Sequence, residues 1–241
     1  NNLLCLGPNK LAAQMEGSKI FMKDVVKKGN IPTATYEVFS DPEPAREYLE
    51  TCDIPIVLKA DGLAGGKGVI VAFTREEALE ALNSLMVDQK LGSAGDNLVI
   101  EEFLKGEEAS FIVLCDGENV IPLASSQDHK QRDDGDKGPN TGGMGAYSPT
   151  PLITKELNEE IMQEIILPTL DELKRRNIEY KGFLYAGLMI DGQEIKVLEY
   201  NCRFGDPETQ PILMRMKSDF LRLCLKAVSY THLRAHETNS H

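Results

Sequence analysis

The stretch KVLEYNCRFGDPETQP, residues 196–211, brings a carboxylate, an amide, a guanidinium and two further acids close together in the sequence. Residues 194–200 are rich in β-formers and follow a turn signal at Asp191 and Gly192, which predicts the second arm of a β-hairpin. Glu199 and Asn201 then share one face, with their Cα atoms about 6.6 Å apart. Such a pair can bind one Mg²⁺ ion, which takes hard oxygen ligands and leaves other positions to phosphate and water. A strand end with surface polar residues is the alternative.

A glycine-rich loop, DGLAGGKG at residues 61–68, joins two apolar segments that read as strands. Lys59 on the first strand is unusual, because burying an ammonium is costly unless an anion meets it. Lys67 adds charge in the loop, which matches neither a P-loop nor GxGxxG. We therefore expect a flap over phosphates, with a flexible turn as the alternative. The backbone amides that can approach a phosphate closely are those of Gly62, Gly65, Gly66 and Gly68.

Composition narrows the class of protein. The 241 residues carry a net charge of −12, with a pI of about 4.9, so the sequence has no basic footprint for nucleic acid. The five cysteines form no CxxC pair, which argues for reduced cytosolic thiols and against a zinc site. No apolar run approaches the roughly 20 residues of a membrane span, and no signal-peptide pattern opens the chain. We expect a soluble, cytoplasmic protein with no nucleic-acid or membrane partner.

Periodicity predicts further elements along the chain. Helices are expected over residues 9–28, 42–52, 74–86, 154–177, 211–216 and 218–227. Strands are expected over residues 98–104, 107–115, 119–127 and 182–191. Thr74 and Glu77 form a capping box, and Pro168 should kink the longest helix. Residues 128–149 are polar and glycine-rich without apolar periodicity, which is typical of a functional or disordered loop. Three of its aspartates lie close together but do not have EF-hand spacing: Asp133, Asp134 and Asp136.

The two ends of the sequence differ from its middle. The first helix begins after only eight residues, which suggests a chain cut from a longer one. Lys19 on that helix reads, by itself, as a solvated lysine. Residues 228–241 hold three of the four histidines and resemble translated adapter sequence, so we expect a disordered tail without function. His232 and His236 have the i, i+4 spacing of metal ligands, but no third ligand accompanies them.

Several blocks closely resemble the phosphoribosylamine–glycine ligases, an ATP-grasp family of purine biosynthesis. They are IVLKADGLAGGKGVIV, VIEEFLKGEEASFIVL, SQDHK, GPNTGGMGAYSP, GFLYAGLMID and VLEYNCRFGDPETQPILMRMKSDF. The resemblance covers residues 7–227 and implies an α+β ATP-grasp fold, in which two lobes clasp ATP. Residues 1–32 would be a remnant of the N-terminal region plus a helix on the large lobe. Residues 33–103 would form the small flap lobe, and residues 104–227 the large lobe with the metal and substrate site. The family's N-terminal and C-terminal domains lie outside this stretch.

The resemblance also implies a reaction and its residues. Glycine would be activated by ATP as glycyl phosphate, and the amine of 5-phosphoribosylamine would displace phosphate to give glycinamide ribonucleotide. Mg²⁺ or Mn²⁺ would bind Glu199 and Asn201, and Arg203 and Asp206 would serve catalysis, Arg203 by neutralising the transferred phosphoryl group. The blocks that line the substrate pocket would contain Asp128, Thr141, Gly142 and also Asp206. ATP contacts would come from Lys19, Lys59, Gly62, Gly65, Gly66, Lys67, Gly68, Glu101, Phe103, Leu104 and Glu108.

Two alternatives stay open. The chain could be a catalytically silent ATP-binding module, because another domain would complete the substrate site. It could also be an ATP-grasp carboxylate–amine ligase with a different acceptor, such as a carboxylase-type relative. The blocks GPNTGGMGAYSP and CRFGDPETQP argue against that second alternative.

Overall fold

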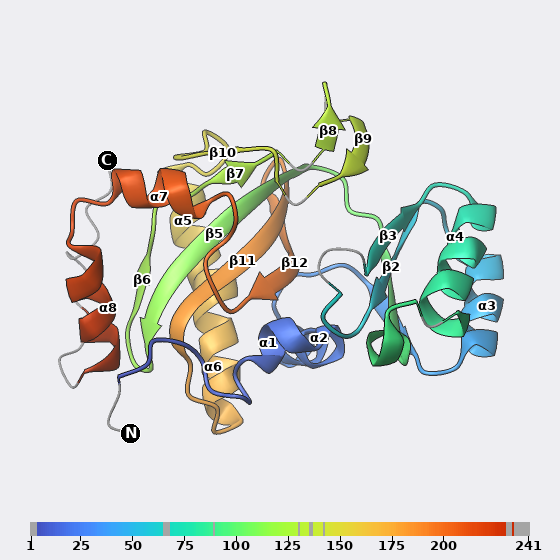
Figure 1. Cartoon of the computed structure of the whole chain (residues 1–241), viewed down its shortest axis with the longest axis horizontal. Helices are drawn as coiled ribbons and strands as arrows, with labels where there is room; N and C mark the ends of the chain where they lie inside the picture. Colours follow the sequence, from blue (N-terminus) through green and yellow to red (C-terminus); the bar gives the residue numbers. More distant parts are fainter. Residues whose placement is uncertain are drawn as a thin grey trace. The chain divides into compact units, whose positions relative to one another are not determined.

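The computed structural model describes residues 4–64, 68–88, 90–129, 131–134, 137–141, 143–229 and 233. The chain divides into two compact units (Figure 1). Unit 1 comprises Asn1–Ala13, Val25–Pro32 and Gly106–His241, and unit 2 comprises Gln14–Asp24 and Thr33–Lys105. Helices and antiparallel sheets occur in both units, so the predicted α+β class is confirmed. No helix among the described residues is both long and apolar enough to cross a membrane.

Unit 2 is built on a four-stranded antiparallel sheet with the order β1-β4-β2-β3. Its strands are β1 (Tyr36–Phe39), β2 (Ile56–Ala60), β3 (Val69–Ala72) and β4 (Leu98–Glu102). Two helices, α3 (Pro42–Thr51) and α4 (Arg75–Leu82), lie side by side against it (Figure 1). Leu49, Leu58, Leu82 and Leu98 are fully buried where these elements meet, and they form the core of the unit. The predicted capping box of α4 is present, and the helix continues as a π turn over Asn83–Val87.

The predicted first helix is interrupted in the structure. Its two parts are α1 (Gln14–Gly17) and α2 (Lys19–Lys28). Ser18 causes the break, because its Oγ accepts a hydrogen bond from the Phe21 amide at 3.1 Å and so caps α2. Asn9 delays the start, since its Oδ1 accepts from the Leu11 and Ala12 amides at 2.9 Å and holds a local turn. A short 3₁₀ helix occupies Gly92–Gly95.

Unit 1 is built on a second four-stranded antiparallel sheet with the order β12-β11-β5-β6. Its strands are β5 (Glu107–Asp116), β6 (Val120–Pro122), β11 (Lys181–Asp191) and β12 (Glu194–Asn201). The helix α6 (Leu167–Arg175) packs on one face of the sheet, where Thr169 Oγ1 lies 2.6 Å from Tyr200 OH. The helices α7 (Thr209–Arg215) and α8 (Phe220–Val228) pack on the face that carries Ile112 and Leu114 (Figure 1). The sheet is therefore covered on both sides.

The longest helical stretch is continuous but irregular. It consists of α5 (Lys155–Ile161), a π turn over Met162–Ile166, and α6. Pro168 at the start of α6 has no amide hydrogen, and its ring would clash with the carbonyl one turn earlier. The wide π turn just before it accommodates the ring. The structure thus has a π turn directly before Pro168, where the sequence predicts a kink.

The polar segment 128–149 is more ordered than its sequence predicts. Four short strands form two pairs: β7 (Gln127–Asp128) with β10 (Ala146–Tyr147), and β8 (Gln131–Asp133) with β9 (Lys137–Asn140). The His129 amide donates to the Gly145 carbonyl at 2.9 Å, and the Met144 amide donates to the His129 carbonyl at 2.8 Å. These backbone bonds need no apolar alternation, which explains why periodicity missed them. Asp136 lies outside the described residues.

The ends of the predicted lobes differ in detail from the structure. Residues 14–24 group with unit 2, whereas the sequence assigned the whole first helix to the large lobe. Val228 belongs to α8, and Leu233 is buried against Leu114 and Ile121, so a disordered tail does not describe these residues. The amide of Leu233 also donates to Asp116 Oδ2 at 2.8 Å. The remaining tail positions, including His232, His236 and His241, lie outside the described residues.

Candidate active site

Glu199 and Asn201 share one face of β12, as their spacing predicts, but a β-bulge decides which face. The register between β11 and β12 shifts between Gly187 and Leu188. Val197 and Tyr200 are both buried although they are three residues apart, which requires the extra bulge residue between them. Without the bulge, strict alternation would place the Glu199 side chain on the face of the sheet in which Val197 is buried. The bulge therefore directs both oxygen-bearing side chains to the opposite face.

A glycine leaves room for the carboxylate. Gly187 lies directly opposite Glu199 in the β11–β12 pair. A Cβ atom on Gly187 would lie 3.2 Å from Glu199 Cγ, which is tighter than an ordinary contact. The Glu199 side chain thus lies over a position that has no side chain of its own.

Arg203 and Asp206 follow β12 in an irregular turn. Arg203 Nη2 donates to Asn201 Oδ1 at 3.3 Å, and Nη1 donates to the Phe204 carbonyl at 3.0 Å. Both Arg203 and Asp206 are exposed. The predicted metal-ligand amide and the predicted phosphoryl-neutralising cation are therefore neighbours in the structure. A planar guanidinium with several donors suits an anionic group at this turn.

The segment that carries Thr141 reaches the same turn. Gly143 has φ +116°, and a Cβ atom there would lie 2.4 Å from Pro207 Cδ, the ring that follows Asp206. Thr141 Oγ1 accepts a hydrogen bond from the Gly143 amide at 3.1 Å. Two sequence blocks that were assigned to one substrate pocket therefore lie against each other. Gly142 lies outside the described residues.

A buried carboxylate on this face was missed by the sequence analysis. Glu208 is 2% exposed, and its Oε1 accepts from Ser110 Oγ at 2.9 Å and from Tyr185 OH at 2.7 Å. Ser110 pairs with Gly187 and Tyr185 with Asn201, so both hydroxyls stand on the face of Glu199 and Asn201. Burial and the charge of Glu208 raise the pKa of Tyr185, which keeps it a neutral donor. A serine within the apolar run of β5 was the available sequence signal.

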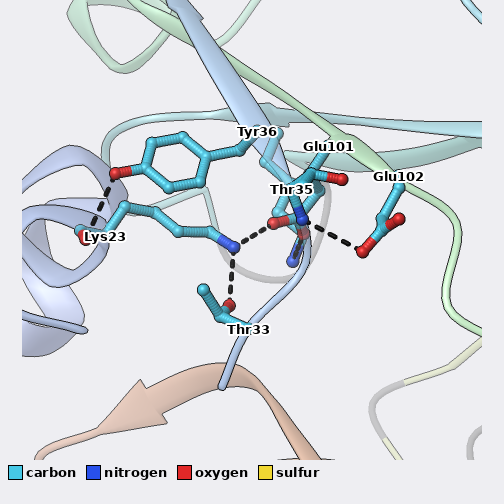
Figure 2. Close-up of polar contacts among 7 residues, drawn as sticks. Lys23, Thr33, Thr35, Tyr36, Glu101 and Glu102 are labelled. Carbon is cyan, nitrogen blue, oxygen red and sulfur yellow. Dashed lines mark hydrogen bonds and ion pairs between the residues drawn. The ribbon is translucent and has the colours of Figure 1, made fainter. Parts of the chain in front are cut away.

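Unit 2 holds a cluster of buried charges. Lys59, on β2, forms an ion pair with Glu101 Oε1, and Lys23, on α2, lies 2.5 Å from Glu101 Oε2. The exposed fractions are 7%, 1% and 2% for Lys59, Lys23 and Glu101. Lys23 Nζ also donates to Thr33 Oγ1 at 2.9 Å (Figure 2). Burial lowers the pKa of Lys23, although the attraction of Glu101 opposes that shift. Lys23 was not predicted, since a lysine on a helix normally reads as solvated.

The start of the glycine loop is tied to the start of α2. Asp61 Oδ1 accepts from Ser18 Oγ at 2.9 Å and from the Ile20 amide at 2.8 Å. Lys19 Nζ then lies 3.5 Å from the Gly62 carbonyl. Asp61, which was not predicted as a site residue, therefore brings Lys19 to the loop. Cβ atoms on Gly62 and Gly68 would approach Ala94 and Ala64 at 2.8 and 2.7 Å, so close packing explains both glycines.

The remaining predicted residues are placed as follows. Phe103 follows β4, is half-buried and packs on Phe73, with ring centroids 5.8 Å apart. Leu104 is also half-buried. Glu108, on β5 in unit 1, lies opposite Met189, and Asp128, on β7, lies opposite Ala146. The described residues do not include Gly65, Gly66 and Lys67.

The donor set on β12 fits a hard divalent cation. Glu199 and Asn201 offer a carboxylate and an amide oxygen on one face, which suits Mg²⁺ or Mn²⁺. Within the described parts of the chain, no group of three or more His, Cys, Asp or Glu side chains could hold a metal ion. A cation bound here would thus take few ligands from protein and the rest from phosphate and water, as Mg²⁺ commonly does beside nucleotides.

Comparison with solved structures defines the class. The biotin carboxylase domain of Hydrogenobacter thermophilus 2-oxoglutarate carboxylase, solved with MgADP, ADP and bicarbonate, has a TM-score of 0.75. It is 20% identical, and the match covers 97% of this chain and 50% of that one. A likeness at this identity shows the fold alone. The family model that matches this chain places that fold in the ATP-grasp class, as the sequence predicted.

The family is shown by sequence. The chain belongs to the family described as phosphoribosylglycinamide synthetase, ATP-grasp (A) domain, which matches residues 17–209. It is 60% identical over 223 residues to the phosphoribosylamine–glycine ligase of Vibrio vulnificus. The matched region covers 92% of this chain and 52% of that protein. The Thermotoga maritima phosphoribosylamine–glycine ligase structure has a TM-score of 0.85 at 37% identity, covering 97% of this chain and 59% of that one. The chain spans about half the length of the curated relatives it matches.

Proposed function

We propose that the chain carries the ATP-binding and phosphoryl-transfer part of a phosphoribosylamine–glycine ligase. That enzyme would join glycine to 5-phosphoribosylamine, with ATP converted to ADP and phosphate by way of glycyl phosphate. The observation that carries the proposal is the bulged end of β12, where Glu199 and Asn201 share a face and Arg203 donates to Asn201. Membership of the family supports the same reaction.

Each group of residues has a proposed task. ATP, when bound, supplies the phosphoryl group that activates the glycine carboxylate. Lys19, Lys59 and the glycine loop hold its phosphates, while backbone groups of residues 101–104 meet adenine and Glu108 meets the ribose. Glu199 and Asn201 hold Mg²⁺ or Mn²⁺, and Arg203 neutralises charge on the transferred group. The substrate pocket is lined by the segments that contain Asp128, Thr141, Gly142 and Asp206. The protein mainly positions reactants and screens charge.

The remaining proposals concern partners and location. The net charge of the chain is −12, so an anionic substrate has to be bound by individual Lys and Arg side chains. Small anionic substrates fit that requirement. We propose a cytoplasmic enzyme that binds neither nucleic acid nor membranes.

The sharpest test of the metal assignment is Glu199→Ala. ATP binding would be measured calorimetrically with and without Mg²⁺, and the variant is expected to lose the Mg²⁺-dependent part of the affinity. Glu194→Ala is the matched control, because Glu194 lies on the same strand, is exposed, and forms a surface ion pair in which its Oε1 lies 3.2 Å from Lys196 Nζ. Undiminished Mg²⁺-dependent binding in Glu199→Ala would refute the assignment.

A second candidate is the catalytically silent ATP-binding module, which would bind ATP without releasing phosphate. Titration with ATP and a phosphate-release assay with both substrates separate the two. Binding with phosphate release supports the ligase, and binding without release supports the silent module. The mass of the product identifies the acceptor if release occurs.

A further inference from the structure

Two buried cations share one buried carboxylate in unit 2. Lys59 pairs with Oε1 of Glu101 and Lys23 with Oε2, so each oxygen has its own ammonium partner. Buried ion pairs normally come in balanced sets, because an uncompensated charge away from water is costly. Two ammonium groups and one carboxylate leave this trio with a formal charge of plus one. An anion that meets the trio would offset that charge.

Lys23 is held firmly in this arrangement. Its Nζ donates to Thr33 Oγ1 at 2.9 Å and lies 5.0 Å from the centroid of the Tyr36 ring. The Lys23 carbonyl accepts from Tyr36 OH at 3.2 Å (Figure 2). Thr33 and Tyr36 thus fix both the ammonium and the backbone of this residue. Such a fixed ammonium can hold the Glu101 carboxylate in one orientation.

We propose that Lys23 is a positioning residue for nucleotide phosphates, which acts by holding one oxygen of Glu101 so that Lys59 keeps part of its charge for a phosphate. The inference rests on the proposed role of Lys59 in ATP binding. Without Lys23, the whole carboxylate would be left to Lys59, and the pair would be neutral. A neutral pair attracts a polyphosphate less than a cluster with a net positive charge.

The experiment compares charge-matched variants of the whole chain. Lys23→Met removes one cation at similar side-chain length, so the affinity for Mg²⁺-ATP is expected to fall by about tenfold or more. Lys23→Met combined with Glu101→Gln restores the net charge of plus one, and its affinity should return to within about threefold of wild type. Lys27→Met on the same helix is the control, because Lys27 is exposed.

Adenosine is the comparison ligand, since it lacks phosphates. Its affinity should be the same in Lys23→Met and wild type, and melting curves followed by circular dichroism should show all variants folded at the assay temperature. If Lys23 only braces the fold, Lys23→Met will weaken ATP and adenosine alike, and the double variant will rescue neither. That result, or an unchanged ATP affinity in Lys23→Met, overturns the inference. Absence of ATP binding by the wild-type chain would instead overturn the proposed function.

Discussion

Tyr200 is a residue whose surroundings fix the direction of its hydrogen bond. Thr169 Oγ1 donates to the Ile165 carbonyl at 2.7 Å, so its single proton is used. Tyr200 OH, 2.6 Å away, must then donate to Thr169 Oγ1. Complete burial raises the pKa of Tyr200, because the phenolate would have no water around it. The Tyr200 hydroxyl therefore stays protonated in the folded chain.

This assignment predicts a specific pH dependence. Below about pH 10 the phenol is protonated in both states, and above it only the unfolded state releases the proton. The free energy of unfolding should therefore fall as the pH rises past about 10. Tyr200→Phe should lower that free energy by about 1 kcal/mol at pH 7, through loss of the hydrogen bond, and should make the alkaline decline shallower. Urea unfolding from pH 7 to alkaline pH measures both, and an equally steep decline in the variant would contradict the assignment.

Single residues were predictable from the sequence where the chemistry is local. The i, i+2 spacing was enough to pair Glu199 with Asn201, and Lys59 was noticed because its strand is apolar. Glu208 could not be found this way, because its partners Ser110 and Tyr185 come from strands distant in sequence. Lys23 was missed for the same reason, since only the folded unit brings Glu101 to it.

At the level of elements, the β-bulge makes Gly187 a sensitive position. Gly187→Ala would place a methyl group 3.2 Å from Glu199 Cγ, so the carboxylate must shift by a few tenths of an ångström. Mg²⁺-dependent ATP affinity is expected to fall by about tenfold, because small displacements of a ligand-binding group are costly. Stability should change by less than about 1 kcal/mol.

Isothermal titration with ATP and Mg²⁺ measures the affinity, and chemical unfolding measures the stability. Gly7→Ala is the control, because a Cβ atom there meets nothing within 4 Å. Equal ATP affinity in Gly187→Ala and Gly7→Ala would show that Glu199 tolerates the crowding and would contradict the prediction.

Regular elements were well predicted, and irregular ones were not. The hairpins β2–β3, β5–β6 and β11–β12 follow from alternation and turn residues. The bulge in β12, the break at Ser18 and the pairs within residues 128–149 depend on individual backbone and side-chain bonds. Periodicity averages over such bonds, so it cannot detect them.

For the molecule as a whole, each unit has its own core, so damage to one should remain local. Leu82 is fully buried in the core of unit 2, and Leu184 is fully buried on β11 in unit 1. Leu82→Ala should cost about 2–5 kcal/mol and increase amide exchange in β2 and β4, with β5 and β11 unchanged. Leu184→Ala should give the reverse pattern. Exchange measured by mass spectrometry tests both, and a uniform increase across the chain in either variant would contradict separate cores.

The two predicted lobes and the two compact units of the structure can be compared along the chain. The sequence divides the lobes after residue 103, and the structure divides the units after Lys105. Residues 14–24 group with unit 2 instead of the large lobe. Sequence periodicity shows that a helix forms but not which core receives it, and here Lys23 and the Asp61 contacts to Ser18 and Ile20 decide that.

The strand order of unit 2 has a consequence for synthesis on the ribosome. Tyr36 of β1 pairs with Glu101 of β4, so the first strand of the sheet finds its partner only in the last. A nascent chain can close the β2–β3 hairpin early, but β1 must wait until residue 102 has left the exit tunnel. Lys23 and Lys59 therefore emerge long before the carboxylate that joins them. The charge trio can therefore form only after Glu101 has emerged, and a chain stalled before that point exposes two cations that the mature protein conceals.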